Sequence, residues 1–488
     1  MGILRRLRDC NSFCFILLGC ILTSIYFALL NNSINTGTDH NHFSSNGQCK
    51  EICRNCKFAL SEKKFEDDFK DMEPMDILTE NVEFPSLFRC NEGFGKKTVS
   101  QRGNYYVIYN FVQAERQFKC MESITLSAPG DFRFLDNIIP LTDSWTGPIS
   151  VALYAPGNDF YTTLNTIAYL RVCQSEIIKQ LVSFHLIFDQ AHTPDAKDEK
   201  TILDAYEEDY DCHLPPPWQT VADEEMYKTQ HNLLYPINLV RNVAKLAAET
   251  YFVFPSDIEL YPTKNFIPKF LQLVKNNLDL FKPGTRNVFV LPIFEILVNA
   301  TIPQDKTKLL QMLKDKTAII FHQSVCVVCH RVIESEKWVK TKETEGLNVF
   351  SVGKRSGRYM VWEPFFVCTQ NEPLWDERMT WEGQSNKMVQ AYTMCVMNYD
   401  FHVLDNAFLI HKPGVKKKKV QMLKFKDVVK NSTKLIFKIG KELQNLYGNN
   451  SNCSTVYRSV MGKTKGKEKP LLKKTDLDVA QKVPQENH

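Results

Sequence analysis

The chain has 488 residues, and its 60 lysines and arginines nearly balance 56 aspartates and glutamates, which leaves a formal net charge of +4. A charge this small for the length argues against a nucleic-acid-binding protein as a whole. Hydrophobic residues make up 43% of the chain, which suits a globular body. Basic runs occur late, at 416–419 and 463–474, and we interpret them as solvated surface and a disordered tail.

The first predicted element is a membrane anchor at residues 12–30. This segment carries no charged residue, and as a helix its 19 residues would span ~28 Å, about the thickness of a bilayer core. Three arginines precede it within residues 1–11, and no lysine or arginine follows until Lys50. The positive-inside rule therefore predicts a cytosolic tail at 1–11 and a lumenal or extracellular remainder. The alternative is a cleaved signal peptide, but the apolar stretch is long for one and no clear cleavage site follows.

Two further features indicate a lumenal body. Sequons of the form Asn-x-Ser/Thr begin at Asn31, Asn299, Asn431, Asn449 and Asn452. Twelve of the 15 cysteines lie beyond the anchor, and an even number in an oxidising compartment favours a disulfide framework. The pairs Cys326-x-x-Cys329 and Cys53-x-x-Cys56 are also compatible with zinc. Neither has a second well-spaced pair nearby, so we favour disulfides.

The composition then divides the remainder of the chain. We predict a polar stem at 31–85, a folded domain at 86–452 and a basic, disordered tail at 453–488. The main predicted elements of the domain are strands at 151–154, 181–188, 251–260 and 287–292, helices at 159–172 and 238–249, and an amphipathic helix at 420–447. Strands that alternate with helices predict an α/β fold with a mostly parallel central sheet.

The strand predicted at 251–260 ends in two carboxylates, Asp257 and Glu259. Side chains two residues apart point to the same face of a strand, and two carboxylates on one face repel unless a cation lies between them. In parallel sheets, ligands bind at the carboxyl ends of the strands. Mg²⁺ and Mn²⁺ commonly join such carboxylates to the phosphates of a nucleotide, so the motif predicts a metal–diphosphate site. The alternative is a solvated strand end.

Eight motifs occur in an order that is far more specific than any one of them. They are Trp-x-Gly-Pro-x-Ser-Val-Ala-Leu-Tyr-Ala-Pro-Gly at 145–157, Tyr-Pro-x-Asn-Leu-x-Arg-Asn-x-Ala at 235–244, Ser-Asp-Ile-Glu-Leu-x-Pro at 256–262, Pro-x-Phe-Glu at 292–295, Cys-x-x-Cys at 326–329, Trp-Glu-Pro-Phe-Phe-Val at 362–367, Asp-Glu-Arg at 376–378 and Phe-Leu-Ile-His-Lys at 408–412. This series resembles the Golgi β-1,4-glucuronyltransferases that prime O-mannose glycans and the second catalytic domain of LARGE-type glycosyltransferases.

The resemblance implies a GT-A nucleotide-sugar-binding fold in a single-pass type II Golgi membrane protein. It also implies an inverting transfer of glucuronic acid from UDP-glucuronate to a glycoprotein glycan, with Mn²⁺ or Mg²⁺ as the cofactor. The positions that match the metal ligands are Asp257, Glu259 and His411. Two carboxylates and one imidazole suit Mn²⁺ better than Ca²⁺. A homodimer or a partner glycosyltransferase is a further expectation.

The donor and the catalytic base involve other residues. Predicted donor contacts are Arg241, Asp257, Arg378 and Asn386, and Lys245 is a further candidate cation for the phosphates. The base should be a carboxylate near the acceptor, and the candidates are Asp376, Glu377 and Glu363, of which we prefer Asp376 and Glu377 to Glu363. Asp376 and Glu377 could instead cap a helix and pair with Arg378.

The sequence departs from the family pattern in three places. Glu259 stands where Asp is usual, residues 381–386 carry one extra residue and lack a Phe, and Pro255 precedes the metal motif although proline cannot donate a hydrogen bond in a central strand. These departures keep two alternatives open. One is another donor, such as UDP-xylose or UDP-N-acetylglucosamine, and the other is a non-catalytic relative that acts as a glycan-binding or chaperone subunit.

Overall fold

The structure of the chain is a computed structural model that describes Phe88, Cys90 and residues 95–322, 328–380, 386–411 and 426–453. All of them belong to the larger of two compact units, Met75–His488. The predicted anchor and stem lie outside the described residues, as does the predicted tail beyond Cys453. None of the helices in the described part of the chain is long and apolar enough to cross a membrane.

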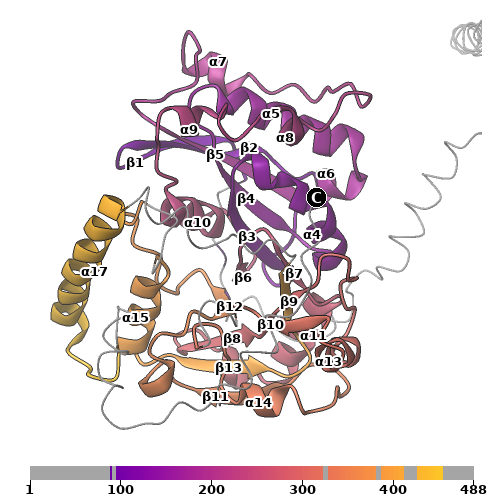
Figure 1. Ribbon diagram of the computed structural model, residues 1–488, viewed down its shortest axis with the longest axis vertical. Helices are drawn as coiled ribbons and strands as arrows, with labels where there is room; N and C mark the ends of the chain where they lie inside the picture. Colours follow the sequence, from indigo (N-terminus) through magenta and orange to yellow (C-terminus); the bar gives the residue numbers. More distant parts are fainter. Residues whose placement is uncertain are drawn as a thin grey trace, which may run out of the picture. The chain divides into compact units, whose positions relative to one another are not determined.

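A ten-stranded sheet runs through this unit in the order β1-β2-β5-β4-β3-β6-β12-β8-β13-β11 (Figure 1). Its strands are β1 (Thr98–Arg102), β2 (Tyr105–Val112), β3 (Ile124–Gly130), β4 (Ile149–Tyr154), β5 (Val182–Asp189), β6 (Phe252–Pro255), β8 (Asn287–Leu291), β11 (Val349–Gly353), β12 (Phe365–Thr369) and β13 (Asp400–Leu404). The run β5-β4-β3-β6 is parallel, and so is the pair β8-β13. The other five pairings are antiparallel.

The predicted α/β class is therefore confirmed, but the prediction of a mostly parallel sheet is wrong, because five of the nine strand pairings are antiparallel. Connection length explains one of these antiparallel pairings, β1-β2, because a short loop returns the chain antiparallel whereas parallel neighbours need a long crossover. Between β4 and β5 the chain forms two helices. Between β1 and β2 only Gly103 and Asn104 intervene, and Gly103 takes a positive φ of 59° that suits a tight hairpin turn.

Helices lie on both faces of the parallel block. The helices are η2 (Phe132–Asn137), α4 (Ile138–Trp145), α5 (Asp159–Cys173), α6 (Glu176–Leu181), α7 (Glu199–Leu203), α8 (Pro217–Thr220), α9 (Tyr227–Gln230), α10 (Ile237–Leu246), α11 (Phe266–Asn276), α12 (Leu278–Phe281), α13 (Lys306–Lys314), α14 (Ser335–Trp338), η3 (Gly357–Tyr359), α15 (Met388–Val396) and α17 (Lys426–Tyr447). The helices predicted at 159–172 and 238–249 are α5 and α10, and the helix predicted at 420–447 is described from Lys426 onward.

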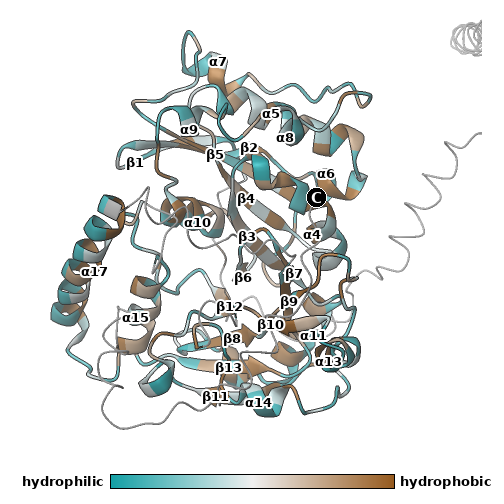
Figure 2. Ribbon diagram, viewed as in Figure 1, coloured by the Kyte–Doolittle hydropathy of each residue, from teal (hydrophilic) through white to brown (hydrophobic). Residues whose placement is uncertain are grey.

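Strand β4 shows why this block is buried on both faces. Ala152 and Tyr154 belong to the apolar cluster that includes α10, while Val151 and Leu153 belong to the cluster that includes α5. Successive residues of a strand point to opposite faces, so a strand covered on both sides needs a continuous apolar run. Figure 2 shows apolar residues in brown along the strands, whereas α17 carries many polar residues in teal.

A second sheet of four strands has the order β10-β9-β14-β7. Its strands are β7 (Leu260–Pro262), β9 (Ile293–Ile296), β10 (Ala318–Ile320) and β14 (Leu409–His411). Strand β14 is parallel to β9 and antiparallel to β7. This pairing brings the late segment that ends at His411 beside the segment that follows the predicted metal motif.

The predicted strand at 251–260 is in fact two strands in different sheets. Strand β6 ends at Pro255, and β7 begins at Leu260. Asp257 and Glu259 lie in the turn between them, closed by a hydrogen bond of 3.1 Å from the Leu260 amide to the Asp257 carbonyl oxygen. The prediction that both carboxylates share one face of one strand is therefore wrong, because the chain leaves the large sheet before the motif.

Pro255 fits this arrangement because it is the last residue of β6. The antiparallel pairing with β12 involves only Phe252 and Val253 of β6, so no ladder hydrogen bond to β12 needs an amide at Pro255. On the β3 side, the amide of Ser256 donates to the carbonyl oxygen of Ser127 at 2.9 Å. The proline thus marks the point where the chain crosses from one sheet to the other.

The predicted disulfide framework is present in the described residues. The bonds are Cys90–Cys120, Cys173–Cys212 and Cys395–Cys453. Cys329 is also disulfide-bonded, and Cys326 of the same motif lies outside the described residues. Cys368 is free and buried within β12, so not every cysteine beyond the anchor is paired.

Candidate functional site

The centre of the candidate site is the carboxylate of Asp257, which is bound on both sides by cations. Arg241 of α10 donates to Oδ1 at 3.2 Å, and Lys387 donates to Oδ2 at 2.8 Å. Burial alone would raise the pKa of Asp257, but the Lys387 ammonium and the Arg241 guanidinium outweigh it and hold the pKa well below its usual range. Asp257 is therefore an ionised carboxylate at neutral pH.

A polar stripe on α10 holds the neighbouring segment in place. Asn238, Arg241, Asn242 and Lys245 are spaced three and four residues apart and so lie along one side of the helix. Arg241 Nη1 donates to the side-chain oxygen of Asn386 at 2.8 Å, and Asn238 donates to the Asn386 carbonyl oxygen at 3.1 Å. Because Asn386 directly precedes Lys387, these bonds fix the backbone from which the lysine reaches Asp257.

The other half of the stripe is structural. Lys245 is fully buried, and its ammonium donates to the carbonyl oxygens of Gln370 and Glu372 at 3.3 and 3.0 Å. Asn242 donates to the Trp375 carbonyl oxygen at 2.8 Å and accepts from the Trp375 amide at 3.0 Å. Lys245 thus anchors the chain near residue 370. Because its ammonium is engaged there, we do not retain Lys245 as a donor contact for the phosphates.

His411 approaches the same turn from β14. It pairs with Leu260 across the small sheet, and the Asp257 charge acts on its ring. Its Nδ1 atom is buried without a hydrogen-bond partner. Burial lowers the pKa of His411, with Asp257 opposing the shift, so the ring is neutral at physiological pH. A neutral imidazole nitrogen and a carboxylate oxygen are both ligands that a divalent metal can accept.

Two of the three predicted metal ligands, Asp257 and Glu259, lie in the β6–β7 turn, and the third, His411, pairs with Leu260 at the end of that turn. Glu259 shares the β6–β7 turn with Asp257, and its charge reaches the neighbouring Tyr261. Within the described ranges, no three side chains of the His, Cys, Asp and Glu types are grouped tightly enough to hold a metal. The residue types and the unsatisfied His411 nitrogen fit a divalent cation, while the Asp257 oxygens are already taken by Arg241 and Lys387.

Glu363 lies at the same site. A small pocket is lined by Arg241, Asp257, Glu363, Lys387 and Trp375 among others. Burial raises the pKa of the Glu363 carboxyl, and the Lys387 charge opposes that shift. The backbone is held in place because the Glu363 amide donates to the Cys329 carbonyl oxygen at 2.8 Å. Glu363 is thus a half-buried carboxyl beside the charged centre.

Asp376, Glu377 and Arg378 are engaged in contacts that tie elements together. Arg378 donates to Asp376 at 2.6 Å and to Glu442 of α17 at 2.8 Å. Glu377 accepts from Asn242 at 2.7 Å and forms an ion pair with Arg102 of β1. The structure therefore favours the structural alternative for this motif, and it does not bring Arg378 to Asp257 through any described contact.

Lys387 is the main residue that sequence reasoning missed. Its side chain is 17% exposed, and its ammonium lies 4.0 Å from the centre of the Phe365 ring. Nothing in its local sequence marks it as functional, because a lysine at the start of a helix is ordinarily solvated. Only its position directly after the predicted donor residue Asn386 could have drawn attention to it.

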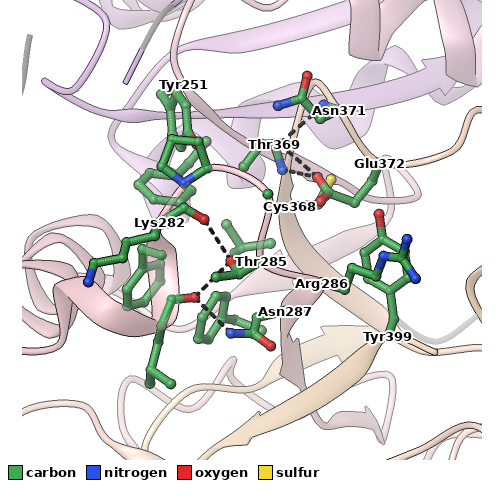
Figure 3. A pocket seen from close by; sticks show the side chains of 17 residues that line it. Tyr251, Lys282, Thr285, Arg286, Asn287, Cys368, Thr369, Asn371, Glu372 and Tyr399 are labelled. Atoms are coloured by element: carbon green, nitrogen blue, oxygen red, sulfur yellow. Dashed lines mark hydrogen bonds between the residues drawn. The ribbon is translucent and has the colours of Figure 1, made fainter. Parts of the chain in front are cut away.

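A larger cavity of about 250 Å³ lies at the opposite end of β6, beside Tyr251 and Phe252. Figure 3 shows it between the loop of Lys282 and Thr285 and the segment that carries Glu372. The Thr285 hydroxyl donates to the Lys282 carbonyl oxygen at 2.8 Å, so the hydrogen-bonding capacity of this hydroxyl is used within the loop. None of the predicted site residues lines this cavity.

Comparison with known proteins gives one family and a set of relatives. The family described as "Glycosyl-transferase for dystroglycan" matches residues 123–448. Beta-1,4-glucuronyltransferase 1 of Danio rerio is 28% identical over 287 residues, which cover 57% of this chain and 63% of the relative. The Bos taurus protein of the same name is 27% identical over 320 residues, which cover 63% of this chain and 72% of the relative.

Xylosyl- and glucuronyltransferase LARGE1 of Mus musculus is 25% identical over 320 residues, which cover 65% of this chain and 34% of the relative. The matched region thus spans about two thirds of the glucuronyltransferases and about one third of LARGE1. Among solved structures, S. aureus TarS 1-349 in complex with UDP aligns at a TM-score of 0.28 and 11% identity, covering 59% of this chain and 60% of that chain. A structural similarity this low indicates neither a shared fold nor a shared function.

Proposed function

The chain belongs to the family of glycosyl-transferases for dystroglycan, and from this premise we propose that it transfers glucuronic acid from UDP-glucuronate to a glycoprotein glycan with inversion. The observation that carries the proposal is the convergence at Asp257. Arg241 comes from α10, His411 from β14, Lys387 from the start of α15 and Glu363 from the segment before β12. Residues spread over 171 positions thus meet at one ionised carboxylate.

We place a Mn²⁺ or Mg²⁺ ion at Asp257, Glu259 and His411. The supporting observations are the ionised state of Asp257, the neutral state of His411 and the unsatisfied Nδ1 atom of His411. When bound, the ion would neutralise the diphosphate that leaves the donor. Arg241 would hold Asp257 in orientation, because its guanidinium is itself fixed by Asn386.

We assign the general base to Glu363 in preference to Asp376 and Glu377. The oxygen of the acceptor hydroxyl attacks C1 of the donor sugar, the bond from C1 to the diphosphate oxygen breaks, UDP leaves, and the hydroxyl proton passes to the base. A base works best when its pKa lies near the working pH, and burial moves the pKa of Glu363 in that direction. Asp376 and Glu377 are instead engaged by Arg378, Asn242 and Arg102.

The larger organisation follows the same proposal. The domain at 86–452 would be of the GT-A type, carried by the cytosolic tail at 1–11, the anchor at 12–30 and the stem at 31–85, and followed by the tail at 453–488. The protein would then be a type II Golgi membrane protein with its catalytic domain in the lumen. All four sequon asparagines in the described residues are exposed, as glycosylation requires.

The test is a transfer assay with the purified full-length chain in detergent. UDP-glucuronate, UDP-xylose and UDP-N-acetylglucosamine are supplied with Mn²⁺ in turn, and release of UDP is measured with and without an O-mannose glycan acceptor. We expect turnover with UDP-glucuronate and its loss in Glu363→Gln. Turnover with another UDP-sugar would replace the donor, and UDP binding with no turnover of any donor would favour the non-catalytic alternative.

A further inference from the structure

We propose that Lys387 is a mobile counter-ion of the donor site, and this inference rests on the proposed function. In the free protein its ammonium neutralises Asp257. A divalent cation would displace it from that carboxylate, and the ammonium would then contact the diphosphate of the nucleoside diphosphate ligand. Lys387 would thereby couple the binding of the metal to the binding of the nucleotide.

The first support is that each oxygen of the Asp257 carboxylate already accepts a hydrogen bond from a cation. Oδ1 accepts from Arg241 at 3.2 Å and Oδ2 accepts from Lys387 at 2.8 Å. A Mn²⁺ or Mg²⁺ ion lies about 2.0–2.2 Å from a carboxylate oxygen that it binds. Two cations so close to one oxygen repel each other strongly in a partly buried site. The metal therefore competes with at least one of the two side chains for the Asp257 carboxylate.

The second support concerns which side chain can move. The Arg241 guanidinium also donates to Asn238 at 3.2 Å and to Asn386 at 2.8 Å, so it is held by three acceptors. The described contacts of the Lys387 ammonium are Asp257 and the face of the Phe365 ring. Arginine presents a rigid planar fork, whereas lysine carries a compact charge on a flexible four-carbon stem. Lys387 is the side chain that can swing.

The third support concerns where the ammonium goes. Its backbone stays in place, because Asn386 is bound to α10 through Asn238 and Arg241, and Lys387 itself caps α15. The displaced ammonium therefore remains within a side chain's length of Asp257. A diphosphate that shares the metal with Asp257 lies in the same space, and its oxygens offer the lysine a new anionic partner.

This arrangement predicts a signature that a fixed positive charge would not produce. A fixed cation near the metal weakens metal binding to the same degree with and without nucleotide. A lysine that exchanges one partner for the other opposes the metal only when nucleotide is absent. The wild-type protein should therefore bind Mn²⁺ more tightly with UDP, and by reciprocity UDP more tightly with Mn²⁺.

The experiment measures this coupling in the full-length chain. Mn²⁺ is titrated into the protein with and without saturating UDP, and free Mn²⁺ is followed by electron paramagnetic resonance. In Lys387→Met we expect Mn²⁺ to bind about tenfold more tightly without UDP, because the competing ion pair is gone. The ratio of the two dissociation constants should fall by about tenfold or more relative to wild type. Lys387→Gln should behave alike, and its amide can keep a hydrogen bond to Asp257 if the Met variant fails to fold.

The matched control is Lys354→Met, which removes a lysine that pairs with Asp400 at the same distance of 2.8 Å outside the site. It should keep the wild-type ratio. An unchanged ratio in both Lys387 variants would overturn the inference and leave the proposed function standing. A wild-type protein that binds neither Mn²⁺ nor UDP would overturn the proposed function, and this inference with it.

Discussion

Replacing Asp257 by Asn should lower stability as well as remove activity. The substitution leaves the Arg241 and Lys387 cations, which are only 8% and 17% exposed, facing each other without a counter-charge. Breaking a fully buried ion pair costs about 3–5 kcal/mol. The carboxylate is 27% exposed and Asn keeps one acceptor oxygen, so we expect a loss of about 2 kcal/mol in the free energy of unfolding.

Urea unfolding followed by tryptophan fluorescence measures this loss. The matched control is Asp400→Asn, because Asp400 pairs with Lys354 where both side chains are more than a third exposed. That variant should lose roughly 0–1 kcal/mol. The double variant Asp257→Asn, Lys387→Met should recover part of the stability, since it removes one of the two opposed cations. If Asp257→Asn is as stable as wild type, Asp257 does not hold these cations and the description of the site is wrong.

The same pair predicts a dependence on pH. The pKa of Asp257 in the folded protein lies below its unfolded value, which is about 3.9. The stabilisation by the ionised carboxylate is therefore fully present above that value and is lost as the pH falls toward the folded pKa. The stability difference between wild type and Asp257→Asn should be constant between pH 5 and 7 and should narrow below about pH 4. A difference that widens on acidification would refute the sign of the shift.

Four further outcomes are expected. His411→Ala should weaken Mn²⁺-dependent UDP binding by more than about tenfold without changing the melting temperature. Calorimetry with and without Mn²⁺ measures this binding, and an unchanged affinity for UDP would contradict the prediction. Glu259→Asp should preserve or raise transfer activity, because it restores the family's ligand length, and a large loss would exclude Glu259 as a metal ligand. Cys395→Ser should destabilise the protein by about 4 kcal/mol in thermal unfolding, because it opens a loop of 58 residues that joins α15 to the segment after α17. An unchanged melting temperature would argue against the bond. Peptide N-glycosidase should shift the mass of the protein, and microsomes should protect its body from protease, whereas digestion from the cytosolic side would end the topology proposal.

The elements whose pattern is local were predictable from the sequence. The apolar runs of β4, β5 and β8 and the amphipathic α10 follow from side-chain periodicity, which depends only on neighbouring residues. The eight ordered motifs led to the family that the comparisons confirm. The number of cysteines also predicted a set of disulfide bonds, and three are described. The free Cys368 shows that an even number of cysteines does not by itself decide which of them are bonded.

What only the tertiary structure decided concerns contacts between distant segments. The sequence gives no physical reason for β6 to end before Asp257, because the break depends on which strands pair with β6 and β7. The local pattern also does not reveal that Lys387 forms an ion pair with Asp257, which lies 130 positions earlier in the chain. Nor does it reveal that Arg378 forms an ion pair with Glu442 of α17. The protonation state and the contacts of a charged side chain depend on the charged residues that lie beside it in the folded protein. Because those residues are distant in the sequence, a local sequence pattern does not identify them.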